Sequence, residues 1–205
     1  MIKYIITGGA GFIGSHLAEK LIHLGYKVII IDNLSTGRLE NISSFRKKLK
    51  FYKLDIKKQS NIEHLFKNID IVFHLAAFSS VIECQQNPDK VILNNIEGSN
   101  NIFQLSVKNN VKVLVYAETS ALYEATKKYP SKEEHIIPRT IYAWSKLVNH
   151  WQAKYYSVNS KTKFVGLRYL NVYGVNQDIR RDFPPVMANF INMIFDKTCY
   201  KIQSN

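Results

Sequence analysis

The sequence has few cysteines and no long apolar run, and these absences exclude several classes of protein. Its two cysteines, Cys84 and Cys199, are far apart and belong to no CxxC or Cys/His pattern. We therefore expect neither a disulfide framework nor a zinc site, and the six dispersed histidines do not suggest metal ligands. No uncharged apolar stretch of about 18 residues and no secretory signal pattern occur, so we expect a cytoplasmic protein without membrane association.

Acidic residues are scarce relative to basic ones. The 205 residues include 28 lysines and arginines but 16 aspartates and glutamates, which gives a formal net charge of +12. This charge suits a phosphate-bearing ligand and raises the alternative of nucleic-acid binding. Most lysines are scattered, however, and the densest basic cluster, from Arg46 to Lys50, is predicted to be a solvated loop. We therefore expect no nucleic-acid partner.

Short apolar runs alternate with helical patterns along the chain. The runs are apolar almost throughout, which is typical of strands that are covered on both faces of a sheet. This alternation predicts an α/β protein with a doubly wound parallel sheet. The predicted strands are Ile2–Thr7, Val28–Ile31, Phe51–Leu54, Ile69–His74, Val111–Ala117 and Lys163–Leu167. The predicted helices are Phe12–Leu24, Ile62–Lys67, Pro88–Asn109, Ile141–Val158 and Phe183–Phe195, and Pro130–Pro138 is predicted to be a surface loop.

A glycine-rich segment, TGGAGFIG from Thr7 to Gly14, joins the first predicted strand to the first predicted helix. Gly8 permits a tight turn, Gly11 lets the backbone approach phosphate oxygens, and Gly14 lets the helix pack closely on the strand. Free N–H groups and the helix dipole at this position favour an anion. The segment therefore predicts a binding site for the pyrophosphate of a dinucleotide.

Asp32 follows the second predicted strand, at about the spacing expected for a carboxylate that hydrogen-bonds the 2′-OH of an adenosine ribose. An aspartate at this position favours NAD over NADP, because its charge would repel a 2′-phosphate. Arg38 supports the alternative, since its side chain could reach such a phosphate.

Tyr142 and Lys146, in the sequence YAWSK, open the helical segment Ile141–Val158. Their i, i+4 spacing places both side chains on one face of a helix. A neighbouring ammonium and a positively charged nicotinamide would favour the phenolate, which could take a proton from a hydroxyl while hydride leaves the same carbon. A second match to this spacing, Tyr123–Lys127, falls in a loop and is interpreted as accidental.

A series of motifs resembles the extended short-chain dehydrogenase/reductase family, and within it the NAD-dependent nucleotide-sugar epimerases and dehydratases. The motifs occur in the family's order over nearly the whole chain. They are TGGAGFIG, DNLSTG at 32–37, HLAA at 74–77, NIEGS at 95–99, YAETSALY at 116–123, YAWSK, and LRYLNVYG at 167–174. The resemblance implies NAD as the cofactor, a nucleotide-sugar substrate and a homodimer. It also implies a Rossmann-like domain over residues 1–175, followed at 176–205 by only the beginning of a substrate-binding region.

The resemblance further implies a role for each candidate site residue. Asn95 would support the catalytic helix, Asn171 would bind a phosphate of the sugar nucleotide, and Thr119, with Ser120 as the second choice, would assist Tyr142. Asp55 and Ile56 would flank the adenine. The residues implied to bind the cofactor are Gly8, Gly11, Phe12, Ile13, Gly14, Asp32, Asn33, Asp55, Ile56, Leu75, Ala76, Ala77, Asn95, Tyr142 and Lys146.

The residues that follow Thr119 favour one reaction within the family. Family members that eliminate water resemble one another in carrying Thr-Asp-Glu at this position, and the decarboxylases usually carry glutamate where this chain has Ala121. The chain has no such carboxylate, which favours 4-epimerisation of a UDP-hexose such as UDP-glucose or UDP-N-acetylglucosamine. A dehydratase, a decarboxylase, a reductase and a protein that binds NAD without turnover remain alternatives.

The chain departs from the family pattern at Glu124, where the resemblance predicts glycine, and at its C-terminus, where members usually continue. An epimerase fragment, an enzyme that another chain completes and a protein that binds NAD without turnover are the alternatives that this shorter length leaves open.

Overall fold

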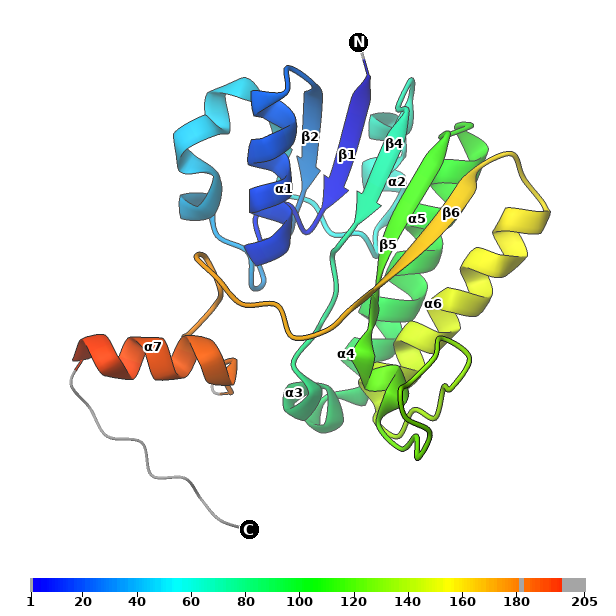
Figure 1. Ribbon diagram of the computed structural model, residues 1–205. Helices are drawn as coiled ribbons and strands as arrows, with labels where there is room; N and C mark the ends of the chain where they lie inside the picture. Colours follow the sequence, from blue (N-terminus) through cyan, green and yellow to red (C-terminus); the bar gives the residue numbers. More distant parts are fainter. Residues whose placement is uncertain (1, 181–182, 197–205) are drawn as a thin grey trace.

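The computed structural model describes residues 2–180 and 183–196, and its centre is one sheet between two layers of helices (Figure 1). The sheet has six strands in the order β3-β2-β1-β4-β5-β6, and every neighbouring pair is parallel. The strands are β1 (Lys3–Thr7), β2 (Lys27–Ile31), β3 (Lys50–Tyr52), β4 (Ile71–His74), β5 (Val113–Thr119) and β6 (Lys163–Tyr169). The predicted doubly wound parallel sheet is confirmed.

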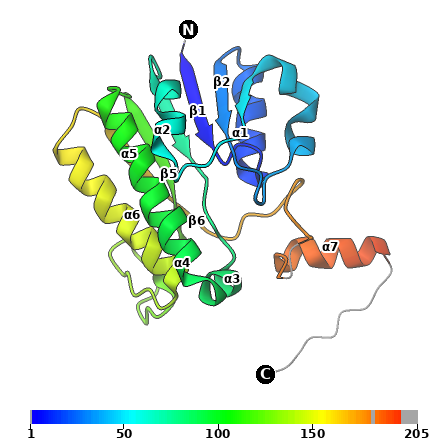
Figure 2. The same cartoon turned by 180° about the vertical axis from the view of Figure 1, so that it is seen from behind.

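Helices cover the two faces of this sheet, as Figures 1 and 2 show from opposite sides. The α-helices are α1 (Phe12–His23), α2 (Gln59–Ile62), α3 (Val81–Gln86), α4 (Pro88–Val91), α5 (Gly98–Lys108), α6 (Ile141–Val158) and α7 (Val186–Asp196). Three 3₁₀ segments, η1 (Leu39–Lys48), η2 (Glu63–Phe66) and η4 (Ser120–Tyr123), and the π-helical η3 (Ile92–Glu97) lie between them. None of the helices within the described residues is long and apolar enough to cross a membrane.

Successive side chains of the central strands enter two separate cores. Ile5 packs in a cluster with Phe66 and Phe103 on the face covered by α2, α5 and α6, while Ile6 packs with Ala18 of α1 on the other face. Because neighbouring residues of a strand point to opposite faces, burial on both sides requires the nearly continuous apolar runs seen in the sequence.

Several predicted boundaries are corrected by the structure. Strand β5 ends at Thr119 rather than Ala117, because its pairing with β6 continues to Tyr169. The basic cluster predicted as a loop belongs mostly to η1, which forms because Ile42 and Phe45 are buried against the sheet. The predicted helix at 62–67 is instead the pair α2 and η2, and α7 begins at Val186 rather than at residue 183.

The predicted helix Pro88–Asn109 is one helical stretch with a widened centre. It consists of α4, the π-helical η3 and α5. Helix α3 was not predicted, and it begins where the Ser80 hydroxyl accepts a hydrogen bond from the Glu83 N–H. Such π-helical turns are frequently found at functional sites.

Candidate active site

A cavity of about 590 Å³ opens at the carboxyl end of the sheet, where ligands bind in open α/β folds. Its walls come from the β1–α1 turn, the ends of β2 and β4, helix α6 and the segment after β6. In both views the segment after β6 runs across this end of the sheet toward α7 (Figures 1 and 2). Most predicted site residues line the cavity: Gly8, Gly11, Phe12, Ile13, Gly14, Asp32, Asn33, Ile56, Leu75, Ala76, Ala77, Tyr142, Lys146 and Asn171.

The glycine turn has the shape of a phosphate-binding site. Gly8 has a φ of +70°, and a Cβ there would lie 2.7 Å from the Ala76 nitrogen. A Cβ on Gly14 would overlap the Gly8 carbonyl oxygen. Helix α1 has no side-chain N-cap and no acidic residue in its first turn, so its first N–H groups stay available to an anion. These residues therefore fit a dinucleotide.

Asp32 is held in place by backbone amides at the end of β2. Its Oδ2 accepts a hydrogen bond from the Ala10 N–H (3.0 Å), and its Oδ1 accepts one from the Leu34 N–H (2.8 Å). Burial raises the pKa of this carboxyl, and both amides oppose that change. Arg38 also lines the cavity, and its buried Nη2 has no hydrogen-bond partner among the described residues.

Two of the predicted cofactor residues are set back from the cavity wall. Asp55 is not among the lining residues, since its carboxylate accepts hydrogen bonds from the Asn33 amide (3.3 Å) and the Lys57 N–H (2.9 Å). Asn95 is fully buried and also does not line the cavity. Its amide bonds both backbone groups of Phe78 and donates to the Ser145 hydroxyl at 3.2 Å. Asn95 therefore joins the loop after β4 to α6.

Tyr142 and Lys146 lie in the first turns of α6, which the Thr140 side chain caps by accepting from the Ala143 N–H. Both side chains line the cavity, and the Thr119 hydroxyl hydrogen-bonds the Tyr142 phenol. Burial raises the pKa of Tyr142, and this hydrogen bond opposes the rise. Lys146 is 3% exposed, and burial lowers its pKa to about 8.

The structure separates Thr119 from the residues considered beside it. Ser120 begins η4, and neither Ser120 nor Thr119 is among the residues that line the cavity, but of the two it is Thr119 whose side chain hydrogen-bonds the Tyr142 phenol. Tyr123, from the second Tyr–Lys match, accepts a hydrogen bond from Arg168 at 2.6 Å and also lies outside the cavity wall. Tyr123 was predicted to lie in a loop, but the structure places it at the end of η4; the interpretation of this match as accidental stays a prediction.

Sequence reasoning did not find a buried polar chain behind the cavity. His74 at the end of β4 joins the Thr7 hydroxyl (2.7 Å) to the Ser99 hydroxyl (2.8 Å), and Ser99 accepts from the Asn149 amide of α6 (3.1 Å). Burial lowers the pKa of His74 to about 3, so its ring is neutral at physiological pH. The chain connects the start of the glycine turn to the helix of Tyr142 and Lys146. Thr7, His74 and Ser99 each lie in a motif found in the sequence, but nothing in the motifs indicated that they contact one another.

Sequence reasoning also missed several residues of the cavity wall. They are Ser79, Asn94, Asn176, Gln177, Pro185, Val186 and Met187. Ser79, Asn176 and Gln177 lie in loops, whereas Asn94 lies in η3 and Pro185, Val186 and Met187 lie at the start of α7. A helical pattern covers the last four, but none of the residues was assigned to the site from the sequence.

The sheet, the glycine turn and the Tyr–Lys helix define a short-chain dehydrogenase/reductase with a dinucleotide cleft. The chain belongs to the NAD dependent epimerase/dehydratase family, whose profile matches residues 4–199. This match confirms the family that the motifs predicted, and the family is NAD-dependent.

The relatives are longer than this chain. A UDP-glucose 4-epimerase of Lacticaseibacillus casei is 34% identical over 180 residues, which cover 84% of this chain and 52% of that protein. The solved UDP-N-acetylglucosamine 4-epimerase from Methanobrevibacter ruminantium has 34% identity and a TM-score of 0.94, covering 100% of this chain and 66% of that one. The Thermus thermophilus UDP-glucose 4-epimerase, in complex with NAD, has 31% identity and a TM-score of 0.87, covering 97% and 64%. A decarboxylase and a dehydratase also match.

Proposed function

We propose that the chain binds NAD and carries the catalytic half of a nucleotide-sugar 4-epimerase that acts on a UDP-hexose, UDP-glucose or UDP-N-acetylglucosamine. The observation that supports this most is that Tyr142 and buried Lys146 line the cavity beside the glycine turn, with the Tyr142 phenol hydrogen-bonded to the Thr119 hydroxyl. The similarity to several 4-epimerases supports the same reaction.

The three polar side chains have distinct tasks in this proposal. When bound, NAD supplies the acceptor for the hydride of the sugar C4 and then its donor. Tyr142, as phenolate, takes the proton of the C4 hydroxyl and gives it back when the hydride returns. Thr119 donates a hydrogen bond that stabilises the phenolate and opposes the effect of burial on the phenol pKa. The positive charge of Lys146, one turn further along α6, favours the phenolate as well. Asn171, in the cavity wall, would bind a phosphate of the sugar nucleotide.

The side chains near Thr119 favour epimerisation over the other family reactions. Elimination of water needs an additional acid and base near the reacting carbons. Neither Ser120 nor Ala121 supplies one. Oxidation and reduction at one carbon need only the Tyr142 phenol and its supports.

A second candidate, NAD binding without turnover, is favoured by apolar side chains beyond β6 that the described residues leave exposed. Leu170 and Val175 are each about three-quarters exposed. The chain spans about half to two thirds of the lengths of its relatives. Large exposed apolar surface marks sites that other protein covers. In this candidate residues 176–205 form only the start of a substrate-binding region, and residues 181–182 and 197–205 of that region lie outside the described part.

One experiment separates the two candidates. NAD titration by calorimetry is combined with an assay for the epimer of UDP-glucose and of UDP-N-acetylglucosamine. Epimer formation by the parent, with a loss of at least about 100-fold in Tyr142→Phe and unchanged NAD affinity, supports the enzyme. Saturable NAD binding without any epimer or transient NADH absorbance supports binding alone, and no NAD binding contradicts both.

A further inference from the structure

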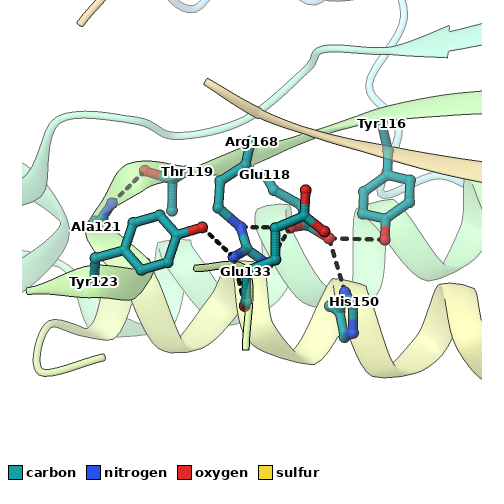
Figure 3. Close-up of polar contacts among 8 residues, drawn as sticks. All are labelled: Tyr116, Glu118, Thr119, Ala121, Tyr123, Glu133, His150 and Arg168. Carbon is teal, nitrogen blue, oxygen red and sulfur yellow. Dashed lines mark hydrogen bonds and ion pairs between the residues drawn. The ribbon is translucent and has the colours of Figure 1, made fainter. Parts of the chain in front are cut away.

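Glu118 is a buried carboxylate directly beside the candidate site. It precedes Thr119 at the end of β5, its exposed fraction is 5%, and it does not line the dinucleotide cavity. A second hollow of about 440 Å³, between α6 and β6, has Glu118 in its wall. Figure 3 shows Tyr116, His150 and Arg168 directed toward this carboxylate.

The two carboxylate oxygens of Glu118 accept hydrogen bonds from residues of three elements, β5, α6 and β6. Oε1 accepts hydrogen bonds from the Tyr116 hydroxyl of β5 (3.0 Å) and from His150 Nδ1 of α6 (2.8 Å). Oε2 accepts from Arg168 Nε of β6, and Arg168 Nη2 lies 3.0 Å from it. A carboxylate only accepts hydrogen bonds, so the proton of His150 is on Nδ1. The group is satisfied by the protein alone, which indicates a structural task rather than a ligand site.

Arg168 carries the network to the surface loop. Its Nη1 donates to the Tyr123 hydroxyl (2.6 Å) and to the Glu133 carbonyl (2.9 Å), and its guanidinium lies over the Tyr123 ring (Figure 3). The network also depends on Gly166, where a Cβ would lie 2.5 Å from Glu118 Oε1 and 2.7 Å from the Tyr116 hydroxyl oxygen.

These partners belong to the three elements that carry the site. Thr119 follows Glu118 in β5, His150 lies one turn after Lys146 in α6, and Arg168 precedes the segment of β6 that leads to Asn171. We propose that Glu118, through His150 and Arg168, is a positioning residue that holds Thr119, the Tyr142–Lys146 pair and the segment of Asn171 in register. This inference rests on the proposed function of the cavity.

The electrostatics agree with this task. Burial by itself would raise the pKa of Glu118, but the hydrogen bonds of His150, Tyr116 and Arg168 together lower it, so the carboxylate stays charged. Of the groups that act on Lys146, Glu118 from β5 and Cys84 from α3 oppose the effect of burial, and His74 from β4 interacts with the same ammonium. The charge of Glu118 therefore favours the protonated lysine.

Glu118→Gln tests the inference because it keeps the shape and removes the charge. The matched control is Glu133→Gln, whose carbonyl, not its side chain, contacts Arg168 in the same hollow. The first readout is the titration midpoint of Lys146. It is measured by NMR of isotope-labelled lysine, with Lys146→Met as the assignment control. We expect a lower midpoint in Glu118→Gln and no change in Glu133→Gln. An unchanged midpoint in folded Glu118→Gln overturns the inference.

The second readout is turnover. The pH profile of kcat is expected to shift with the Lys146 midpoint, while KM for the sugar nucleotide changes less than about threefold. A parent that neither binds NAD nor forms an epimer contradicts the proposed function, and the lysine titration still decides the role of Glu118.

If Glu118→Gln does not fold, a second pair of variants tests the positioning role of Glu118. His150 is half-buried and more tolerant of change: His150→Leu removes the donor to Glu118, and His150→Asn keeps a donor near the position of Nδ1. We expect NAD affinity to fall about tenfold in His150→Leu and to stay within about twofold in His150→Asn, because Lys146 lies one turn away. Equal affinity of His150→Leu and the parent contradicts the positioning role.

Discussion

Two buried ionisable side chains, Lys146 and His74, affect both the stability of the fold and the geometry of the site. Lys146 and His74 are both almost fully buried, and burial disfavours the charged form of each. The neutral His74 ring suits its position, because it joins two hydroxyls without a charge. Lys146 near neutral pH is mostly charged and therefore costs free energy of folding.

Lys146→Met is expected to stabilise the chain while it removes function. The folded pKa of about 8 lies below the unfolded value near 10.5, so the penalty is full below pH 8 and disappears as the pH rises through both values. Removing the charge should raise the free energy of unfolding at pH 7 by about 1–3 kcal/mol and weaken NAD binding more than tenfold. Urea unfolding measures the free energy of unfolding and calorimetry measures NAD affinity, with Lys161→Met, at an exposed lysine, as the control. A destabilised Lys146→Met would contradict the argument.

His74 is expected to make the fold sensitive to acid. Its folded pKa of about 3 lies below the unfolded value near 6.5, so its contribution is complete above pH 6.5 and is lost as the pH falls toward 3. The loss should be on the order of 3–5 kcal/mol. Urea unfolding at a series of pH values should show this slope in the parent and in exposed His23→Gln, and a flatter one in His74→Gln. If the free energy of unfolding changed with pH equally in all three proteins, His74 would not be the cause of the acid sensitivity.

At the scale of elements, the start of α6 is the part that most directly sets the site. Its N-cap residue, Thr140, receives an additional constraint from Glu124, which the family resemblance did not predict. Glu124 Oε2 accepts from the Arg139 and Thr140 N–H groups (2.8 and 2.9 Å), and Oε1 accepts from the Thr140 hydroxyl (2.8 Å). A carboxylate also suits the positive end of the helix dipole.

Glu124→Gly should therefore loosen the first turn of α6. We expect a loss of about 1 kcal/mol in the free energy of unfolding, similar to the loss of a helix cap. Amide exchange at Ala143 and Trp144 should accelerate, while the amides of α5 stay protected. Glu124→Gln, which keeps one acceptor oxygen, serves as the matched control and should retain part of the effect. Unchanged exchange at Ala143 in Glu124→Gly would show that Thr140 caps the helix alone.

At the scale of the whole molecule, an apolar face on α6 has no cover among the described residues. Trp144, Trp151, Tyr155 and Val158 lie on this helix and are all more than half exposed. Their spacing of about one or two turns places them along one side. We propose that the homodimer implied by the motif resemblance pairs through this face of α6.

Trp151→Glu should disrupt such a dimer. Sedimentation velocity is expected to show a dimer for the parent and a monomer for the variant, because a buried unpaired charge is costly at an interface. Leu24→Glu, an equally exposed apolar residue after α1, is the control and should remain dimeric. A monomeric parent would contradict the proposed dimer, and a dimeric Trp151→Glu would place the interface elsewhere.

The sequence by itself determined the features that depend on local spacing. Apolar runs that alternate with helical patterns predicted the parallel sheet, and the glycine turn and the Tyr142–Lys146 pair each occupy one short segment, so their mutual geometry follows from a turn or a helix. Boundaries were less accurate, because burial of Ile42 and Phe45 in η1 and the pairing of β5 with β6 are long-range effects.

Only the tertiary structure decided which polar groups support the site. The contacts of Glu118 with His150 and Arg168, and of His74 with Thr7 and Ser99, join residues far apart in the chain. All of these residues except His150 lie in motifs found in the sequence, but a motif does not show which residue of another segment its members contact. A buried charge or hydroxyl needs a partner, and the fold determines which residue supplies it.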